Sequence, residues 1–107
     1  MMELLHYQKN DGYTPFAGWM STLDPGTRAR IARHIDRMKL GNMGDSKHLQ
    51  GGVFEKKIDF GPGYRLYYSR EGNKIIVLLC GGDKSTQGRD IDRALEYLHD
   101  HVERTPK

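Results

Sequence analysis

The feature that most constrains the fold is an uninterrupted apolar run, IIVLLC, at residues 75–80. A strand with one face in water alternates apolar and polar residues, whereas a strand covered on both faces is apolar throughout. The run therefore predicts a central β-strand with packed layers on both sides. Two glycines, Gly81 and Gly82, follow it, and the charged and polar cluster DKST at residues 83–86 comes next. The exposed end of a buried strand holds polar groups rigidly, and catalytic and phosphate-binding groups are often placed there.

Two segments before this run have the period of two residues that is typical of half-buried strands. Residues 53–60 (VFEKKIDF) and residues 64–70 (YRLYYSR) alternate, and the tight-turn sequence Gly-Pro-Gly at 61–63 separates them. A second turn signal, EGN at residues 71–73, precedes the apolar run. Together these segments predict an antiparallel meander of three strands. We expect residues 43–52 (MGDSKHLQGG) to be a loop.

Helical signals lie on both sides of the predicted meander. Thr14-Pro15 and Asp24-Pro25 each combine a capping residue with a proline at the first helical position. Apolar residues at helical spacing follow each pair, namely Phe16, Trp19, Met20 and Leu23, and then Ile31, Ala32, Ile35 and Met38. A C-terminal helix is predicted with Ser85 or Thr86 as its cap and with Ile91, Ala94, Leu95, Leu98 and Val102 on its apolar face.

A short strand at residues 2–7 (MELLHY) completes the predicted order of strand, two-helix hairpin, three-strand antiparallel meander and C-terminal helix. This order is typical of an α+β domain. A chain of 107 residues has room for one small domain, so we expect residues 1–107 to fold as a single unit. The one cysteine, Cys80, ends the apolar run and is expected to be a small core residue that forms no internal disulfide.

No targeting signal, metal site or cofactor site is apparent in the sequence. No apolar stretch is long enough for a membrane span, and the start, MMELLHYQKN, lacks the apolar run of a signal peptide. We therefore expect a cytoplasmic protein with no membrane contact. The five histidines form no recognised ligand spacing with Cys80, so neither a metal nor a cofactor is expected. The string GGDKST is not a P-loop, because Asp83 stands where a glycine should precede the lysine.

Positive charge is concentrated in one predicted helix. The net charge of the chain is +3. The segment RARIARHIDRMK at residues 28–39 holds the cations Arg28, Arg30, Arg33, Arg37 and Lys39 against the single acid Asp36. A basic helix of this kind suits an anionic partner, either nucleic acid or an acidic protein. The alternative is a solvated helix face that binds nothing.

The predicted meander gathers groups suited to phosphate chemistry on its outward face. Glu55, Lys57 and Asp59 alternate along one strand, and Arg65 and Tyr67 lie on the next. Neighbouring strands lie about 5 Å apart, so these side chains can share one patch. The cations can hold an anionic backbone while a carboxylate, tyrosine or amine exchanges protons. The alternative is a solvent-facing sheet surface with cross-strand ion pairs.

Five further residues lie near this patch or its rim. The rim beyond the third strand adds Asp83, Lys84 and Ser85. There the glycine pair is expected to let the backbone turn close to a phosphate, and the helix start would offer free N–H groups to an anion. The simpler alternative is a glycine-rich turn that only caps the last helix. Lys56 is predicted on the apolar side of its strand, with its ammonium group reaching water. His48, in the predicted loop, lies just before the strand and within reach of the patch.

Three strings, in this order, resemble one family of toxins. They are GDSK at residues 44–47, IDFGPGYRLYY at residues 58–68 and LLCGGDKSTQ at residues 78–87. From about residue 14 to about residue 100, the chain is similar to the "addiction module killer protein" branch of the RelE/HigB/ParE toxin superfamily. The resemblance implies a RelE-like fold and a bacterial or phage-derived toxin of a type II toxin–antitoxin system. It also implies a small antitoxin as partner, often a helix-turn-helix protein.

The resemblance further implies a chemistry and a set of residues. Relatives of RelE bind mRNA in the ribosomal A site and cut it without metal. The 2′-hydroxyl of the RNA attacks the neighbouring phosphate, leaving a 2′,3′-cyclic phosphate and a 5′-hydroxyl. Lys57, with Lys56 as the alternative, matches the lysine on the second strand of the family, and Arg65 matches the arginine on the third. After the fourth strand the family has an arginine and a tyrosine. Lys84 stands in place of the arginine, and no tyrosine follows it closely, since Tyr97 lies deep in the predicted last helix.

The remaining family patterns keep other readings open. HigB-type enzymes use histidine and acidic groups, and the matching candidates here are His48, Asp59 and Asp83. ParE-like relatives keep the fold, lack ribonuclease chemistry and poison DNA gyrase. The sequence therefore predicts an mRNA interferase, with a non-enzymatic gyrase inhibitor and an inactive, antitoxin-binding relic as alternatives.

Overall fold

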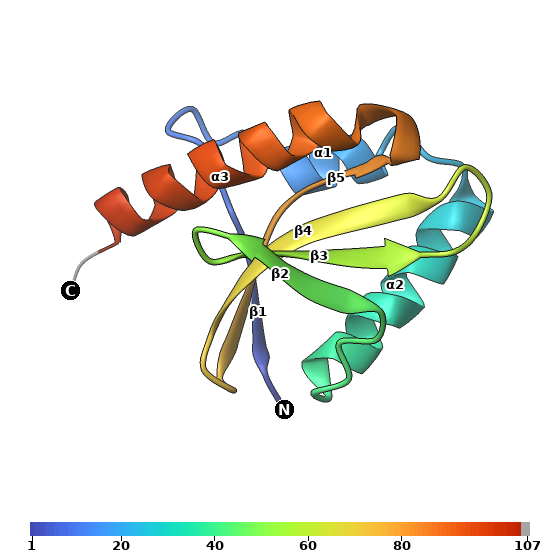
Figure 1. The fold of residues 1–107 in the computed structure, drawn as a ribbon, viewed down its shortest axis with the longest axis horizontal. Coiled ribbons are helices and arrows are strands. Elements are labelled where there is room, and N and C mark those ends of the chain that lie inside the picture. Colours follow the sequence, from blue (N-terminus) through green and yellow to red (C-terminus); the bar gives the residue numbers. More distant parts are fainter. Residues whose placement is uncertain (106–107) are drawn as a thin grey trace.

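A computed structural model describes residues 1–105 and shows a five-stranded mixed sheet with helices on both faces (Figure 1). In chain order the elements are β1 (Glu3–His6), α1 (Pro15–Met20), α2 (Pro25–Lys39), β2 (Ser46–Gln50), β3 (Val53–Ile58), β4 (Tyr64–Glu71), β5 (Ile75–Asp83), the 3₁₀ turn η1 (Lys84–Thr86) and α3 (Gln87–Arg104). The predicted α+β class is confirmed, although the sheet differs in detail. Among these described helices, none combines the length and apolar character required to cross a membrane.

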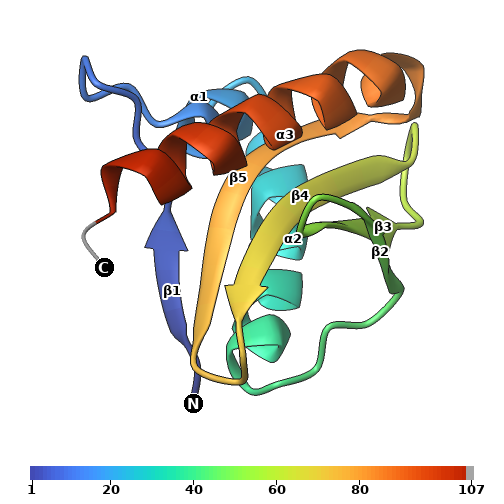
Figure 2. The same ribbon diagram turned by 60° about the vertical axis from the view of Figure 1, so that its left-hand side comes forward.

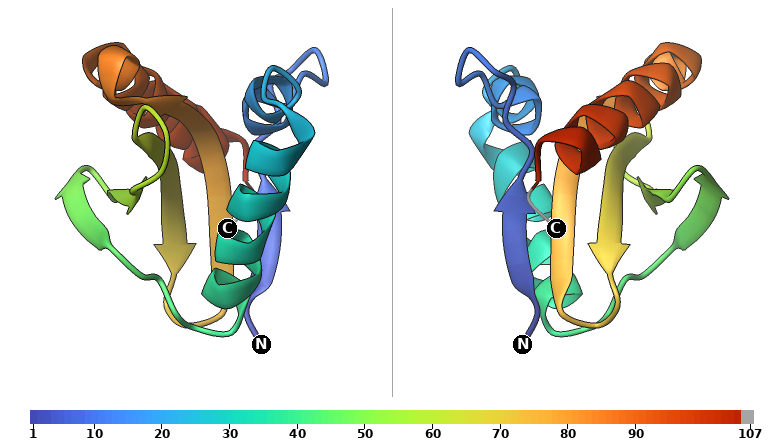
Figure 3. Two further views of the ribbon diagram at one scale, coloured as in Figure 1. Left: turned by 90° about the vertical axis from the view of Figure 1, so that its right-hand side faces the viewer. Right: turned by 90° about the vertical axis from the view of Figure 1, so that its left-hand side faces the viewer.

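The strands lie in the order β1-β5-β4-β3-β2. β1 pairs with β5 in parallel, and the other neighbours are antiparallel. β5 therefore has a strand on each side of it. α1 and α2 cover one face of the sheet, and α3 crosses the opposite face (Figures 2 and 3).

β5 supplies both hydrophobic cores by alternation. Ile76 and Leu78 enter the core beneath α1 and α2, whereas Val77 and Leu79 enter the core beneath α3. All four are at most 1% exposed, so the prediction of a strand covered on both faces is confirmed. Cys80 belongs to the second core, and burial raises the pKa of its thiol to about 12. A thiol with that pKa is protonated at neutral pH and is a poor nucleophile.

Residues 43–52, predicted to be a loop, contain β2, so the antiparallel part of the sheet has four strands instead of three. β2 is polar (SKHLQ), and only Ser46 and Leu49 are half-buried. An edge strand of this kind is held by backbone pairing and needs no apolar alternation. A break in register between His48 and Gln50 disturbs the pattern further. The period of the sequence therefore gave no signal for this strand.

Both N-terminal helices begin at the predicted prolines. The carboxylate of Asp24 caps α2, accepting hydrogen bonds from the Thr27 N–H at 3.1 Å and from the Thr27 hydroxyl at 2.6 Å. The Thr14 side chain makes no such bond to α1, contrary to expectation. α1 is shorter than its apolar pattern, so Leu23 packs on the core from the turn that follows. Ala32 lies on the exposed side of α2 and not in the buried stripe.

The start of α3 differs from the prediction, because η1 precedes the helix. The Asp83 carboxylate accepts hydrogen bonds from the Ser85 N–H at 2.8 Å and from the Ser85 hydroxyl at 2.5 Å. The Thr86 hydroxyl bonds the carboxylate of Asp90 and makes no capping bond to α3. The Asp83 N–H in turn donates to the Thr86 hydroxyl at 3.3 Å, so Asp83 and Thr86 form a capping box around η1, before the start of α3.

Gly81 and Gly82 belong to β5 and do not form a flexible turn. Neither has a positive φ angle, so the prediction of a glycine turn is wrong. A Cβ atom at Gly81 would overlap the ring of Trp19 in α1, and one at Gly82 would overlap the carboxylate of Asp90 in α3. The two glycines are needed because a helix packs closely on each face of the strand end.

Gly81→Ala should lower the free energy of unfolding by about 1–3 kcal/mol, because the added methyl group displaces the Trp19 ring from β5. Gly88→Ala is the matched control, since Gly88 is exposed in α3 and a Cβ atom there meets nothing within 4 Å. It should leave stability unchanged or raise it by up to about 1 kcal/mol. Urea denaturation followed by circular dichroism measures both. Equal stabilities would show that Trp19 can move without cost.

Candidate functional site

One cavity at the end of the sheet brings together the three residues predicted to be catalytic. Its volume is about 230 Å³, and its charged lining residues are Asp45, Lys57, Asp59, Arg65 and Lys84. Lys57 on β3 and Arg65 on β4 are direct cross-strand partners. Lys84 follows β5, whose last residue pairs with the first residue of β4. The register of three strands therefore brings these cations together at one cavity, which we call the cation cavity.

The cation cavity contains charges of both signs. Three cations face two carboxylates, which leaves one excess positive charge. Lys57 and Lys84 are exposed, whereas Arg65 is only 7% exposed. An anion in the cavity would meet two exposed ammonium groups and one buried guanidinium group. The carboxylates of Asp45 and Asp59 are available there as proton acceptors.

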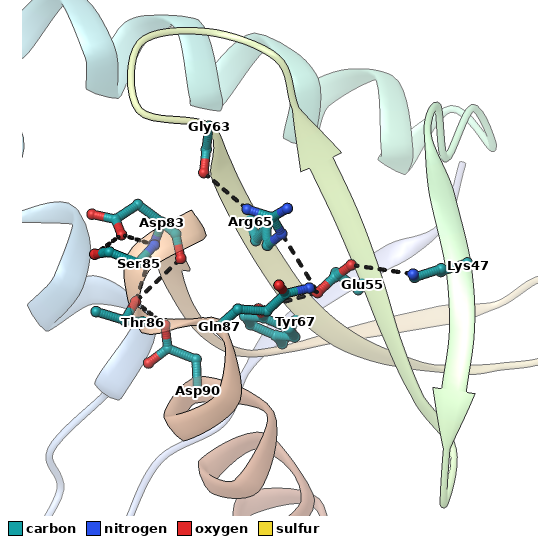
Figure 4. Close-up of polar contacts among 10 residues, drawn as sticks. All are labelled: Lys47, Glu55, Gly63, Arg65, Tyr67, Asp83, Ser85, Thr86, Gln87 and Asp90. Atoms are coloured by element: carbon teal, nitrogen blue, oxygen red, sulfur yellow. Dashed lines mark hydrogen bonds and ion pairs between the residues drawn. The ribbon is translucent and has the colours of Figure 1, made fainter.

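A buried carboxylate lies behind Arg65 (Figure 4). Glu55 is 1% exposed. Its Oε2 atom accepts hydrogen bonds from the Gln87 amide at 2.8 Å and from the Tyr67 hydroxyl at 3.2 Å. Arg65 Nε lies 3.7 Å from Oε2, and Lys47 Nζ lies 4.0 Å from Oε1. Within residues 1–105, Oε1 of Glu55 and Nε of Arg65 have no hydrogen-bond partner. We call these five side chains the Glu55 cluster.

Glu55 and Tyr67 were predicted on an open, outward-facing patch, and for these two residues that prediction is wrong. They do lie on the face opposite Phe54, but α3 covers that face. Burial, together with the charge of Glu55, raises the pKa of Tyr67. The phenol therefore stays protonated and donates to Glu55, which leaves it unsuited to proton exchange with a substrate. The accessible part of the predicted patch is the cation cavity.

Two candidates lie on the other face of the sheet. Lys56 is 3% exposed, and its ammonium group donates a hydrogen bond to the Met43 carbonyl at 2.9 Å. Burial lowers the pKa of Lys56, and the expectation that this ammonium group reaches water is wrong. His48 is exposed on β2, with its ring centroid 5.1 Å from that of Phe54. The pairing of β2 with β3 thus directs both side chains away from Arg65.

Asp83 and Ser85 form the capping turn before α3. Their side-chain hydrogen bond lowers the pKa of Asp83, so this carboxylate stays ionised. The N–H of Ser85 already donates to Asp83, which removes the free donor that the sequence predicted for an anion. Asp83 also lines a different cavity, between α1 and α3, and does not line the cation cavity.

Three residues of this region were missed by the sequence reasoning. The carbonyl of Asp45 accepts a hydrogen bond from the N–H of Lys57 at 2.8 Å, which brings this loop to the cation cavity. Asp45 and Lys47 both belong to the GDSK string, so the family resemblance carried a signal for them. Gln87 reaches Glu55 from 32 residues further along the chain, and no local pattern indicates that contact.

Gln87→Ala should lower the free energy of unfolding by about 1.5–3 kcal/mol, because it removes a hydrogen bond to a buried carboxylate. Gln50→Ala is the control, since Gln50 is exposed on β2, and it should change stability by less than about 0.5 kcal/mol. Urea denaturation at neutral pH measures both. If the two variants were equally stable, water would have to replace Gln87 at Glu55 without cost.

Comparison with known proteins places the chain in a family. The family described as "Phage derived protein Gp49-like" matches residues 18–98, a span that includes every charged residue of the cation cavity. An uncharacterised protein of Haemophilus influenzae (strain Rd) is 45% identical over 80 residues, which cover 74% of this chain and 81% of the relative. The chain belongs to the phage-derived Gp49-like family, a toxin-like family related to RelE and HigB.

Proposed function

We propose that this chain is the toxin of a type II toxin–antitoxin system, from the addiction module killer protein branch, and that it cleaves mRNA on the ribosome. The observation that carries the proposal is the meeting of Lys57, Arg65 and Lys84 at one cavity beside two carboxylates. Membership of a toxin-like family supports the toxin assignment. Cations alone would bind an anionic strand, whereas cations beside proton acceptors can also catalyse the cleavage of a phosphodiester bond.

The proposed reaction is a transesterification within the RNA strand. The 2′-oxygen attacks the neighbouring phosphorus while its proton passes to Asp59 or Asp45. The bond from phosphorus to the 5′-oxygen breaks, and the ammonium group of Lys57 or Lys84 supplies a proton to that oxygen. The products are a 2′,3′-cyclic phosphate and a 5′-hydroxyl, so no water or other reactant is consumed.

Arg65 and Lys84 stabilise the charge that builds up on the pentavalent phosphate. Arg65 is suited to this role because it is held in place: its NH1 group lies 3.4 Å from the Gly63 carbonyl, and its Nε atom faces Glu55. A donor fixed before the reaction needs no reorganisation when the charge develops. Lys84 is exposed and adjusts to the bound strand.

Arg65→Ala and Lys84→Ala should each slow mRNA cleavage about 100-fold, because each removes one cation from the transferring phosphate. Lys74→Ala is the control, since Lys74 is an exposed lysine before the start of β5, whereas the cation cavity lies beyond its end. Each variant is expressed from a tightly repressed promoter, and the 5′ ends of cellular transcripts are mapped after induction. Arg65→Lys and a circular dichroism spectrum separate lost chemistry from lost folding, because Arg65 also contacts buried Glu55.

Growth arrest with intact transcripts would contradict the nuclease proposal. If toxicity then survived both alanine substitutions and was accompanied by DNA damage, a ParE-like action on DNA gyrase would replace it. Absence of any growth effect from the wild-type chain would instead indicate a relic that only binds its antitoxin.

The proposed antitoxin neutralises positive charge on α2. Arg30, Arg33 and Arg37 are exposed on this helix, and within residues 1–105 none of them forms an ion pair. Arg30 lies over the Phe60 ring at 3.9 Å, so it also has a packing role. We propose that an acidic segment of the antitoxin docks on α2 through Arg33 and Arg37.

Arg33→Glu combined with Arg37→Glu should slow association with the antitoxin about 10-fold or more at low salt and flatten its salt dependence. The fold should survive, because the buried positions of α2 are Thr27, Ile31, Ile35 and Met38. Surface plasmon resonance at low and high salt measures the rates, with the double lysine substitution at the same positions as control. Unchanged association rates would contradict docking on α2, and the cation cavity would then become the proposed binding site of the antitoxin.

A further inference from the structure

A second cavity lies between α1 and α3, at the end of β5 and next to the cation cavity. Its volume is about 360 Å³, which lies in the range of small-ligand sites. Tyr13 and Trp19 line it from the α1 side, Arg89 and Arg93 line it from α3, and residues 81–82 of β5 lie between them. We call it the aromatic cavity, and the chemistry proposed above makes no use of it.

Two aromatic rings at this cavity differ in how they are held. Tyr13 is 53% exposed, and the hydroxyl end of its ring lies against Gly18 of α1, where a Cβ atom would overlap it. Trp19 is half-buried, because its ring packs on Gly81 and lies 5.7 Å from the Phe16 ring, between centroids. A fixed ring and an exposed ring beside one cavity offer a stacking surface to a flat ligand. Every nucleobase has a π-face that stacks on such rings.

The charges of the aromatic cavity are balanced, in contrast to those of the cation cavity. Arg89 and Arg93 stand against the carboxylates of Asp83 and Asp90. Each carboxylate already accepts a hydrogen bond from a neighbouring hydroxyl group. No excess charge remains to attract a bare phosphate. Donors and acceptors side by side match the edge of a nucleobase, which carries both.

The two cavities adjoin one another. Asp83 lines the aromatic cavity, and the next residue, Lys84, lines the cation cavity. Trp19 of the aromatic cavity also meets Tyr64 of the cation cavity edge to face, with 6.1 Å between the ring centroids. One RNA strand can therefore place a phosphate in the cation cavity and the base of an adjoining nucleotide in the aromatic cavity.

We propose that the aromatic cavity binds one unstacked nucleobase of single-stranded RNA, beside the phosphate that is cleaved. The inference rests on the nuclease function proposed above and adds a binding subsite to it. Stacking on Tyr13 and Trp19 supplies the affinity, and Arg93 donates to the edge of the base. The bound base holds the strand so that its neighbouring phosphate stays against Lys57, Arg65 and Lys84.

Trp19 is the single tryptophan of the chain, so its fluorescence reports on this cavity directly. The probe is a hexaribonucleotide with 2′-O-methyl groups, which cannot be cleaved, together with a matched set of hexamers that each lack one base. Trp19 emission is read with unlabelled RNA, and total binding is read by anisotropy of labelled RNA at low salt. The intact hexamer should quench Trp19. Loss of the base at one position should abolish the quench and weaken binding about 5- to 100-fold.

Two variants at Tyr13 sharpen the test, because this residue is exposed and its replacement leaves the core intact. Tyr13→Ala should weaken binding of the intact hexamer about 5- to 100-fold, whereas Tyr13→Phe, which keeps the ring, should bind as the wild type does. Arg65→Ala should weaken binding of intact and abasic hexamers equally, since it acts on the phosphate.

Three outcomes would overturn the subsite. One is unchanged Trp19 emission while anisotropy reports binding that depends on Arg65, in which case the RNA binds and no base enters the cavity. Another is equal quenching of Trp19 by every abasic hexamer, which would show that the quenching comes from binding of the phosphates and not of a base. The third is absence of any RNA binding. Transcript mapping decides the nuclease proposal separately in each case, so the two can fail independently.

Discussion

The burial of the Glu55 carboxylate is the interaction on which the candidate site depends. A carboxylate that is 1% exposed has lost its hydration, and such a charge costs several kcal/mol unless partners replace the water. Here Tyr67 from β4 and Gln87 from α3 donate hydrogen bonds to Oε2, while Arg65 from β4 and Lys47 from β2 lie at ion-pair distances of 3.7 and 4.0 Å. The docking of the first turn of α3 and the fixed position of Arg65 are therefore two consequences of one buried charge on β3.

A second constraint acts at the end of β5. Because Gly81 has no side chain, Trp19 can lie against the strand, and because Gly82 has none, Asp90 can approach from the other face. α1 and α3 thus close on the strand end at the point where the chain turns into η1. Residues 83 and 84 then line different cavities, one balanced in charge and aromatic, the other with excess positive charge. The glycine pair contributes to the site through packing, and no unusual backbone conformation is involved.

The sequence predicted the parts of the fold that local chemistry decides. The apolar run of β5 required cover on both faces, and the prolines at positions 15 and 25 marked the two helix starts. Alternation correctly placed Glu55 and Phe54 on opposite faces of the sheet. It could not show whether the Glu55 face is exposed to water or covered by a helix from a distant part of the chain. Alternation also placed Lys56 on the apolar side of β3, and only the expectation that its ammonium group reaches water was wrong. His48 stayed a candidate because its face follows from the pairing of β2 with β3, and polar β2 gave no periodic signal. The meeting of Lys57, Arg65 and Lys84 was predictable, because a meander with short turns allows few registers.

The pairing of Arg65 with Glu55 bears on how such a site distinguishes its substrate. A guanidinium group that already faces a buried carboxylate at 3.7 Å attracts a ground-state phosphodiester less than a free one would. Only one excess positive charge remains in the cation cavity, so charge alone would attract the proposed RNA substrate weakly there. Weak ground-state binding has a catalytic advantage, since a charge interaction accelerates the reaction only to the extent that it strengthens in the transition state. In the proposed reaction, Arg65, Lys57 and Lys84 would act most strongly on the additional negative charge of the pentavalent phosphate. Under the proposed function, affinity for the strand would then come from contacts away from the reacting phosphate, with neighbouring bases or with the ribosome, and the cation cavity would carry the chemistry.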